Sequence, residues 1–325
     1  MRQALRIEAP ARLHLGFLDL HGGLGRRFGS IGLTLEGIAT RLLLEPGPAD
    51  SSASPEAARI GRIQELLQRT LGLPPAKVGV EAAIPSHVGL GSGTQLGLAL
   101  GVGQARLAGR ELDAAAIGQV LERGARSGIG IAAFTHGGLI TDGGKGSGDA
   151  PPPILSRLPF PEAWRVLLVM DEARQGLSGE AERQAFRHLP EFPAELAAHL
   201  CRLVLMRFLP GIALEDIAAA GAAIGEIQRL VGDHFAPVQG GRFISRGVTE
   251  ALAWLEAEGI AGIGQSSWGP TGFALLEDAP TAERLAMALA TRFAEPFPTL
   301  RFQVVAGRNR GALITPVGVD READA

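Results

Sequence analysis

The chain has 325 residues, of which 46% are hydrophobic and 20% charged, and its formal net charge is −3. This length and apolar content can fill two cores, so we expect two folded domains and no extensive disorder. A slightly acidic chain does not attract nucleic acid or an anionic membrane surface, and the single cysteine, Cys201, excludes an internal disulfide.

Extended segments and one helix are expected before residue 85. Residues 4–19 are predicted to form a strand, a bend at Pro10 and a second extended run in which Leu13 and Leu15 share one face. Alternating apolar residues predict further strands, and apolar residues at helical spacing predict a helix between them. These strands cover residues 29–45 and 77–84, and the helix includes residues 60–67.

The segment PSHVGLGSGTQLG, residues 85–97, places a glycine-rich loop between a predicted strand and a predicted helix. Backbone N–H groups in such a loop and the positive end of the helix dipole favour an anion, and glycine lets a phosphate approach closely. We expect a phosphate cradle here, with a purely structural turn as the alternative. The cradle residues are Gly89, Gly91, Ser92, Gly93 and Thr94.

Several common motifs are not matched. No lysine follows these glycines as in a Walker loop, and the spacing G-x-G-x-G is not the Rossmann G-x-G-x-x-G. At residues 264–268, tryptophan replaces the last glycine of the hydrolase motif G-x-S-x-G. The histidines show no H-E-x-x-H spacing, so a zinc site is not expected.

A glycine- and proline-rich segment, residues 143–153, is the predicted boundary between two domains. Beyond it, the pattern predicts a buried strand, several helices, a glycine-rich turn leading into a strand, and a closing strand. The helices are expected at residues 194–209, 215–231, 249–259 and 282–295, and the strands at residues 164–170, 271–277 and 301–306. We therefore expect an α+β protein with domains over residues 1–150 and 151–325.

Three segments resemble the motifs of the GHMP kinase superfamily. Residues 85–94 follow its middle motif, P-x-x-x-G-L-G-S-S-A, and depart from it at the second serine. Residues 9–19 resemble its first motif, and residues 262–275 occupy the place of its third. The resemblance implies a two-domain GHMP kinase-like α+β fold, with a ribosomal S5 domain 2-like N-terminal domain and a ferredoxin-like C-terminal domain.

The chain departs from the kinases after the middle motif. Many of them continue with S-G-x-D, whose aspartate takes a proton from the attacking hydroxyl, whereas here Ser127-Gly128-Ile129 is followed by Gly130. One subfamily, the β-ribofuranosylaminobenzene 5′-phosphate synthases, resembles the chain in this departure and in longer segments. These are RLHLGFLDL, GLGRRFGSIGL, RSGIGIAAFTHGGLITDGG, GLSGEAERQAF, FAPVQGGRF and GQSSWGPTGFAL.

The subfamily resemblance implies a reaction. Phosphoribosyl pyrophosphate is joined to 4-hydroxybenzoate or 4-aminobenzoate through a C–C bond, with release of carbon dioxide and pyrophosphate, in tetrahydromethanopterin biosynthesis. The glycine-rich cradle is then expected to hold the pyrophosphate, with Mg²⁺ neutralising this leaving group. The resemblance also suggests a homodimer.

Candidate site residues fall into three groups. The catalytic candidates are Arg26, Asp19, Asp142 and His14, and the magnesium candidates are Ser92 and Asp142. The substrate-binding candidates are Arg12, Arg27, Arg126, Ser127, Ser266, Ser267 and Trp268. Structural alternatives are a satisfied strand histidine at residue 14, a turn cap at residue 142 and a core tryptophan at residue 268.

Two other functions stay open at this point. The first is an ATP-dependent small-molecule kinase on the same scaffold, which Gly130 and the Ser266–Trp268 loop disfavour. The second is a catalytically silent ligand sensor, because a fold does not dictate a function. The N-terminal residues lack a continuous apolar run, so we expect no signal peptide. No run reaches the about 18 apolar residues that a membrane helix needs, so we expect a soluble cytoplasmic protein.

Overall fold

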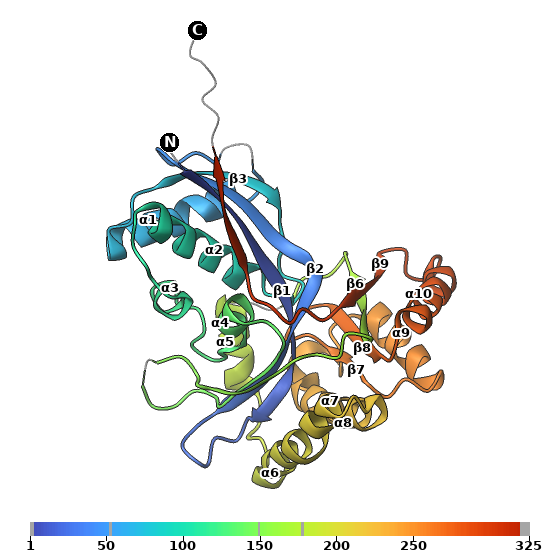
Figure 1. Ribbon diagram of the computed structural model, residues 1–325. Helices are drawn as coiled ribbons and strands as arrows, with labels where there is room; N and C mark the ends of the chain where they lie inside the picture. The colour runs from blue at the N-terminus through green and yellow to red at the C-terminus, as the bar shows by residue number, and fades with distance from the viewer. Residues whose placement is uncertain (1–2, 52–53, 149, 177–178, 319–325) are drawn as a thin grey trace.

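The computed structural model describes residues 3–51, 54–148, 150–176 and 179–318, and it contains two antiparallel sheets (Figure 1). In the first sheet the strand order is β10-β1-β2-β4-β5, with β3 paired to β2, and in the second it is β7-β8-β6-β9. The first sheet comprises β1 (Gln3–Asp19), β2 (Phe28–Pro46), β3 (Ala76–Ala82), β4 (Leu139–Asp142), β5 (Ile154–Leu158) and β10 (Leu313–Gly318). The second comprises β6 (Arg165–Asp171), β7 (Ile263–Gln265), β8 (Thr271–Leu276) and β9 (Leu300–Ala306).

Helices cover both sheets. Those nearest the first sheet are α1 (Ala57–Leu71), α2 (Ser92–Leu107), α3 (Ala114–Val120) and α4 (Ile129–Thr135), and α5 (Gly179–His188) lies beside them (Figure 1). The others are α6 (Ala194–Leu203), the π-helical turn η1 (Val204–Phe208), α7 (Leu209–Ala213), α8 (Ile217–Gln239), α9 (Arg246–Ala257) and α10 (Ala279–Phe293). The expected strands and helices are present, so the α+β prediction is confirmed.

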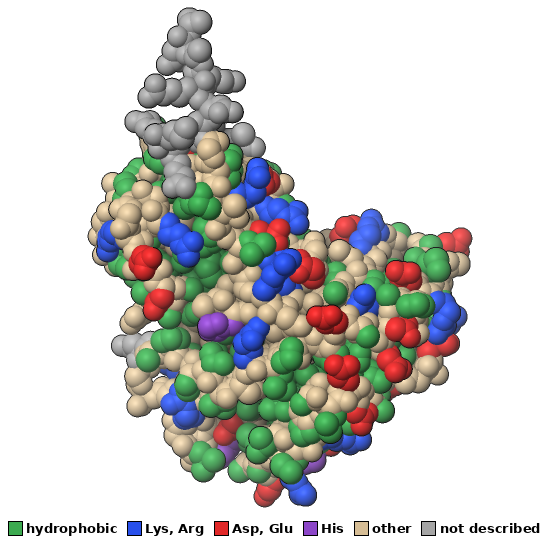
Figure 2. Space-filling view, in the orientation of Figure 1, with side chains coloured by type: hydrophobic (Ala, Val, Ile, Leu, Met, Phe, Trp, Pro, Cys, Tyr) green, Lys and Arg blue, Asp and Glu red, His purple; other side chains and the backbone are tan. Residues whose placement is uncertain are grey.

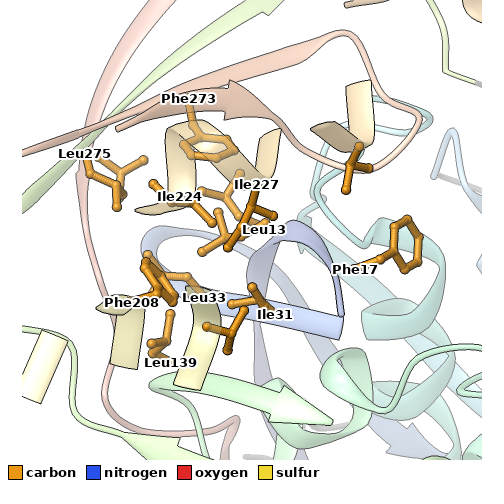
Figure 3. Packing of buried hydrophobic residues seen from close by; sticks show 14 of the residues in the cluster. Leu13, Phe17, Ile31, Leu33, Leu139, Phe208, Ile224, Ile227, Phe273 and Leu275 are labelled. Atoms are coloured by element: carbon orange, nitrogen blue, oxygen red, sulfur yellow. The ribbon is translucent and has the colours of Figure 1, made fainter. Parts of the chain in front are cut away.

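The paired strands β1 and β2 extend through both halves of the molecule. At one end, Leu5 and Ile7 join a core that contains the apolar residues of α2. At the other end, Leu13 and Leu15 join a second core with residues of α8 and β8, part of which is drawn in Figure 3. The strand β1 continues through Pro10 to Asp19, and a register shift between Pro10 and Arg12 lies where the bend was expected.

The sheets do not follow the predicted division at residues 150 and 151. Residues 143–153 were expected to form a linker, but they join β4 to its antiparallel neighbour β5. The strand β10 also returns to pair with β1. Just before it, the buried Arg308 forms ion pairs with Glu8 (2.5 Å) and Glu36 (3.0 Å), so the last strand is fixed to the first.

The continuous helical stretch Ala194–Ala213, formed by α6, η1 and α7, is long and apolar enough by length and composition to cross a membrane. Arg202 and Arg207 interrupt this stretch, so it is not a continuous run of apolar residues. It packs on β1 and α8, and its Leu200 and Phe208 are buried. Hydrophobic side chains also gather over this helical region on the face shown in Figure 2.

Three glycines lie at close backbone contacts around the glycine-rich loop. A Cβ on Gly269 would overlap the backbone of Val88 and Gly89, and a Cβ on Gly176 would overlap the carbonyl group of Trp268. Gly89 itself has a left-handed backbone (φ +89°), which favours glycine. The glycine-rich loop before α2 is therefore pressed against the loop between β7 and β8.

We predict that Gly269→Ala lowers the free energy of unfolding by about 1–3 kcal/mol, because the added methyl group must displace backbone atoms. Urea denaturation of wild type and variant measures this difference. Gly47→Ala is the matched control, because a Cβ there meets no atom within 4 Å. Equal stability of the two variants would contradict the proposed close packing.

Candidate active site

A cavity of about 670 Å³ opens between the two halves. Its wall is formed by β1, the first turn of α1, the glycine-rich loop with the start of α2, the loop between α3 and α4, α5, and the loop between β7 and β8. All five predicted cradle residues line this cavity, together with His14, Arg12, Arg126, Ser127, Ser267 and Trp268. The structure thus brings most of the sequence candidates to one place.

The glycine-rich loop ends in the first turn of α2. Gly91 precedes the helix with a left-handed backbone (φ 86°), and its carbonyl group accepts the N–H groups of Thr94 and Gln95. The earlier N–H groups of a helix have no acceptor within the helix, so the start of α2 presents donors and a positive dipole end to the cavity. This geometry is typical of an anion site.

Among the described residues, five arginines and three glutamates line the cavity. A Cβ on Gly93 would lie 2.6 Å from Nη2 of Arg59 and 3.7 Å from the guanidinium of Arg123, so this glycine makes room for two cations. Desolvation and the charge of Arg59 lower the pKa of Arg123. Two cations held this close favour a ligand with more than one negative charge.

Arg12 lies against the other side of the glycine-rich loop. Its Nη1 atom donates a hydrogen bond to the carbonyl oxygen of Gly89 (2.6 Å), whereas its buried Nε atom has no acceptor among the described residues. Burial lowers the pKa of Arg12 to about 10, and the carboxylate of Glu182 opposes this shift. Arg12 therefore stays charged at neutral pH and has a donor available.

Aromatic side chains form the other end of the cavity. The ring of Phe186 lies edge-on to Phe17 (6.3 Å between centroids) and to Trp268 (5.4 Å). Arg126 lies 5.2 Å from the centre of the Phe186 ring and forms an ion pair with Glu182 (2.6 Å). Apolar rings next to a charged pair suit a ligand with an aromatic ring and a polar substituent.

His14 is a neutral histidine at the boundary between these two ends. Burial, together with the charges of Arg12 and Arg126, lowers its pKa to about 3. The N–H group of Gly16 donates to Nδ1 (3.4 Å), so the proton of the neutral ring is on Nε2. His14 thus acts at neutral pH as a hydrogen-bond donor from Nε2, and the role of proton carrier does not fit it.

The loop between β7 and β8 supports the glycine-rich loop. The fully buried Ser266 donates to the carbonyl oxygen of Gly89 (2.8 Å) and accepts the N–H of His14 (3.0 Å). Ser267, which has φ +56°, lines the cavity. Trp268 is 2% exposed, and its indole N–H has no acceptor among the described residues, so it is a core tryptophan with an unused donor.

Asp142 is a buried structural carboxylate. Its Oδ1 atom accepts the N–H groups of Ser30 and Gly144, and its Oδ2 atom accepts the hydroxyl of Ser127 and the N–H of Gly128. Burial raises its pKa, and these hydrogen bonds act in the opposite direction. Asp142 does not line the cavity; it positions Ser127, which does.

Three further candidates from the N-terminal motif lie outside the cavity wall. Arg26 donates to the carbonyl oxygens of Gly143 and Gly144, both at 2.6 Å. Arg27 donates to the carbonyl oxygen of Leu20, and Asp19 accepts the N–H of the following turn. Arg26 therefore holds the loop between β1 and β2 against the loop after β4, whereas Arg27 and Asp19 make contacts within the connection between β1 and β2.

Gly130 occupies a tight contact between α2 and α4. A Cβ there would lie 3.0 Å from the methyl carbon of Thr94, and the side chain of Gln95 donates to the Gly130 carbonyl oxygen (2.9 Å). Thr94 therefore fills the space that the aspartate side chain of a kinase would need. This packing gives the departure from S-G-x-D a physical reason.

The residues present fit a magnesium ion only in part. Among the described residues, no group of three or more His, Cys, Asp or Glu side chains converges. Magnesium in phosphate sites needs only one or two protein oxygens, because water and phosphate supply the others. The hydroxyl of Ser92, which lines the cavity near Glu56, fits this requirement, whereas the carboxylate of Asp142 is enclosed by four donors.

Sequence reasoning missed several residues of the wall. Arg59 and Arg62 are three residues apart on α1 and lie on the same side of that helix, and Arg123 is three residues before Arg126. Glu182 lies in the segment GLSGEAERQAF, which contributed to the resemblance. The arginine spacings were a usable signal, but arginines on a helix are usually solvated, and only the fold shows that these converge.

The chain is similar in sequence to known protein families. Family models match the chain as the GHMP kinases N terminal domain over residues 58–138 and as the GHMP kinases C terminal region over residues 208–295. The chain is 32% identical to the β-ribofuranosylphenol 5′-phosphate synthase of Archaeoglobus fulgidus, over 95% of this chain and 99% of that protein. It is 31% identical to the synthase of the same name from Methanothermobacter thermautotrophicus, over 95% and 98%.

Solved structures share the fold at lower identity. The mevalonate diphosphate decarboxylase of Staphylococcus aureus has a TM-score of 0.67 and 16% identity, covering 97% of this chain and 98% of that one. The homoserine kinase of Cytophaga hutchinsonii has a TM-score of 0.66, also with 16% identity and the same coverage. The expected two-domain GHMP kinase-like fold is confirmed.

The low pKa of His14 gives a prediction on acid stability. An unfolded chain protonates this histidine near pH 6.5, whereas the folded chain does so only near pH 3, so stability is lost as the pH falls through this range. The His14→Gln variant should lose less free energy of unfolding over this range, by up to about 1.4 kcal/mol per pH unit. Urea denaturation of wild type and variant between pH 7 and pH 4 measures this difference. The exposed His188→Gln is the control, and equal slopes for wild type and His14→Gln would contradict the assignment.

Proposed function

The chain belongs to the β-ribofuranosylphenol 5′-phosphate synthase family of the GHMP kinase superfamily, and we propose that it is a decarboxylating C-glycoside synthase. It joins phosphoribosyl pyrophosphate to a para-substituted benzoate and releases carbon dioxide and pyrophosphate in tetrahydromethanopterin biosynthesis. One observation carries this assignment: a single cavity has an arginine-lined anion site at one end and an aromatic wall at the other.

The anion end suits the pyrophosphate group. Arg59 and Arg123 converge over Gly93, and the start of α2 adds its dipole. Negative charge on pyrophosphate increases as the bond to ribose C1 breaks, so fixed cations stabilise the transition state more than the ground state. When Mg²⁺ is bound it supplies further positive charge to this leaving group, and Ser92 is the residue we expect to hold it.

The aromatic end suits the benzoate. Phe186 and Trp268 line the cavity with apolar rings, and Arg126, which is paired with Glu182, adds a charged pair beside the Phe186 ring. The relatives in Archaeoglobus fulgidus and Methanothermobacter thermautotrophicus are named for a ribofuranosylphenol. We therefore propose 4-hydroxybenzoate, whose product is a phenol, in preference to 4-aminobenzoate. A homodimer in the cytoplasm completes the proposal.

The kinase alternative is disfavoured by packing. A kinase of this superfamily with S-G-x-D uses an aspartate where this chain has Gly130, and Thr94 lies against that position. The solved kinases with this fold are too distant in sequence to assign a reaction. The sensor alternative has no observation of its own in its favour.

The test is an assay with phosphoribosyl pyrophosphate, magnesium and carboxyl-labelled 4-hydroxybenzoate or 4-aminobenzoate. We expect labelled carbon dioxide and pyrophosphate in a one-to-one ratio, with 4-hydroxybenzoate the better substrate. Consumption of ATP with a hydroxyl substrate, and no release of labelled carbon dioxide, would favour the kinase instead.

We predict that Arg59→Ala and Arg123→Ala each raise the KM for phosphoribosyl pyrophosphate at least tenfold, because each removes a cation from the anion site. Tenfold corresponds to about 1.4 kcal/mol. The KM for the benzoate should change less than threefold, which initial-rate kinetics with each substrate varied in turn can measure. Arg246→Ala, on the exposed surface of α9, is the control, and an unchanged KM in both cavity variants would contradict this placement of the pyrophosphate.

A further inference from the structure

The reaction needs a group that accepts the proton of the 4-hydroxyl, because the ring carbon becomes a strong nucleophile only as that oxygen gives up its proton. Three carboxylates line the cavity among the described residues: Glu56, Glu122 and Glu182. This inference rests on the proposed function and asks which of the three serves the aromatic end.

Two of these carboxylates lie at the anion end. Glu56 forms an ion pair with Arg59 (3.2 Å) and accepts a hydrogen bond from the hydroxyl of Ser86 (3.3 Å). Glu122 is exposed and lies next to Arg123. Both carboxylates are therefore associated with the arginines that converge on the pyrophosphate position.

Glu182 lies at the aromatic end. It precedes Phe186 by one helical turn on α5, so both side chains lie on the same face of that helix. Its carboxylate is 2.6 Å from Nη2 of Arg126, and the guanidinium of Arg126 is 5.2 Å from the ring centre of Phe186. Its charge also opposes the lowering of the Arg12 pKa, so the carboxylate lies near that guanidinium.

Several other polar groups near this end are poor acceptors. The Nδ1 atom of His14 already accepts the N–H of Gly16, and its Nε2 atom carries the proton. The carboxylate of Asp142 is enclosed by four donors outside the cavity wall. Arg12, Arg126 and Trp268 present only donors. Among the described residues at the aromatic end, this leaves one carboxylate.

We propose that Glu182 is the general base that takes the proton from the 4-hydroxyl of the benzoate and later returns it. As Glu182 accepts the proton, the oxygen electron pair moves into the ring, and the ring carbon that bears the carboxylate forms the bond to ribose C1. The bond from C1 to pyrophosphate breaks, and pyrophosphate leaves with that electron pair.

Loss of carbon dioxide completes the cycle. The bond from the ring to the carboxylate breaks, and its electron pair restores the aromatic ring and the negative charge on the para oxygen. Glu182 then returns its proton to that oxygen, which gives the phenol and regenerates the carboxylate. No proton is gained or lost overall, and no oxidant is needed. Arg126 is a positioning residue that holds Glu182 through its ion pair.

The test compares Glu182→Gln with wild type on two benzoates. We expect the kcat of Glu182→Gln with 4-hydroxybenzoate to fall at least 100-fold near pH 7, with the KM for phosphoribosyl pyrophosphate unchanged within threefold. With 3,5-difluoro-4-hydroxybenzoate, whose hydroxyl ionises at lower pH without help, the ratio of wild-type to variant rates should shrink at least tenfold. A group that only positions the substrate would give the same ratio for both benzoates.

Two further variants separate a loss of the general base from a general loss of folding or charge. Glu250→Gln also removes a carboxylate that pairs with an arginine, but on the exposed surface of α9, and should retain wild-type rates. Glu182→Asp keeps a carboxylate and should retain more activity than Glu182→Gln, which also tests the idea if the amide variant folds poorly. Equal rates for Glu182→Gln and wild type, or an equal loss on both benzoates, would overturn the role of Glu182. A wild-type protein inactive on every benzoate would instead overturn the proposed function.

Discussion

The backbone contact between the glycine-rich loop and the loop of residues 266–269 determines the geometry of the cavity. A side chain on Gly89 or Gly269 would separate the two segments, and Ser266 ties them to β1 through two hydrogen bonds. Because each half contributes one of these loops, the anion end and the aromatic end keep a fixed distance from one another. A reaction that joins two different substrates depends on such a fixed distance, since aligned reactants avoid much of the entropic barrier.

Positive charge exceeds negative charge among the described side chains that line the cavity, and this excess favours an anionic ligand. Like charges at Arg59 and Arg123 repel each other, and burial of Arg12 removes water from a cation. Both effects reduce the stability of the protein without ligand and are relieved by an anionic ligand. Glu182 offsets part of the positive charge at the aromatic end through its ion pair with Arg126.

Sequence patterns predicted most of the elements and the place of the anion site, because hydrophobic periodicity and glycine spacing are local properties. These patterns did not predict the position of a side chain where that position depends on contacts between distant segments. Asp142 looked like a ligand, but four donors from three segments enclose it, and Arg26 looked catalytic but supports a loop. The local patterns around Arg59 and Glu182 could not show that they line one cavity, because each enters it only through the packing of its helix against a remote part of the chain.

The return of β10 to the edge of β1 has a consequence for biosynthesis. The strand β1 pairs on one side with β2, but its other edge stays unpaired until residues 313–318 have emerged from the ribosome, when Arg308 can also join Glu8 and Glu36. The first sheet therefore cannot be completed before β10 is made, and it exposes a strand edge until then. A nascent chain of this kind benefits from a chaperone, and fragments that end before β10 are at risk of edge-to-edge aggregation.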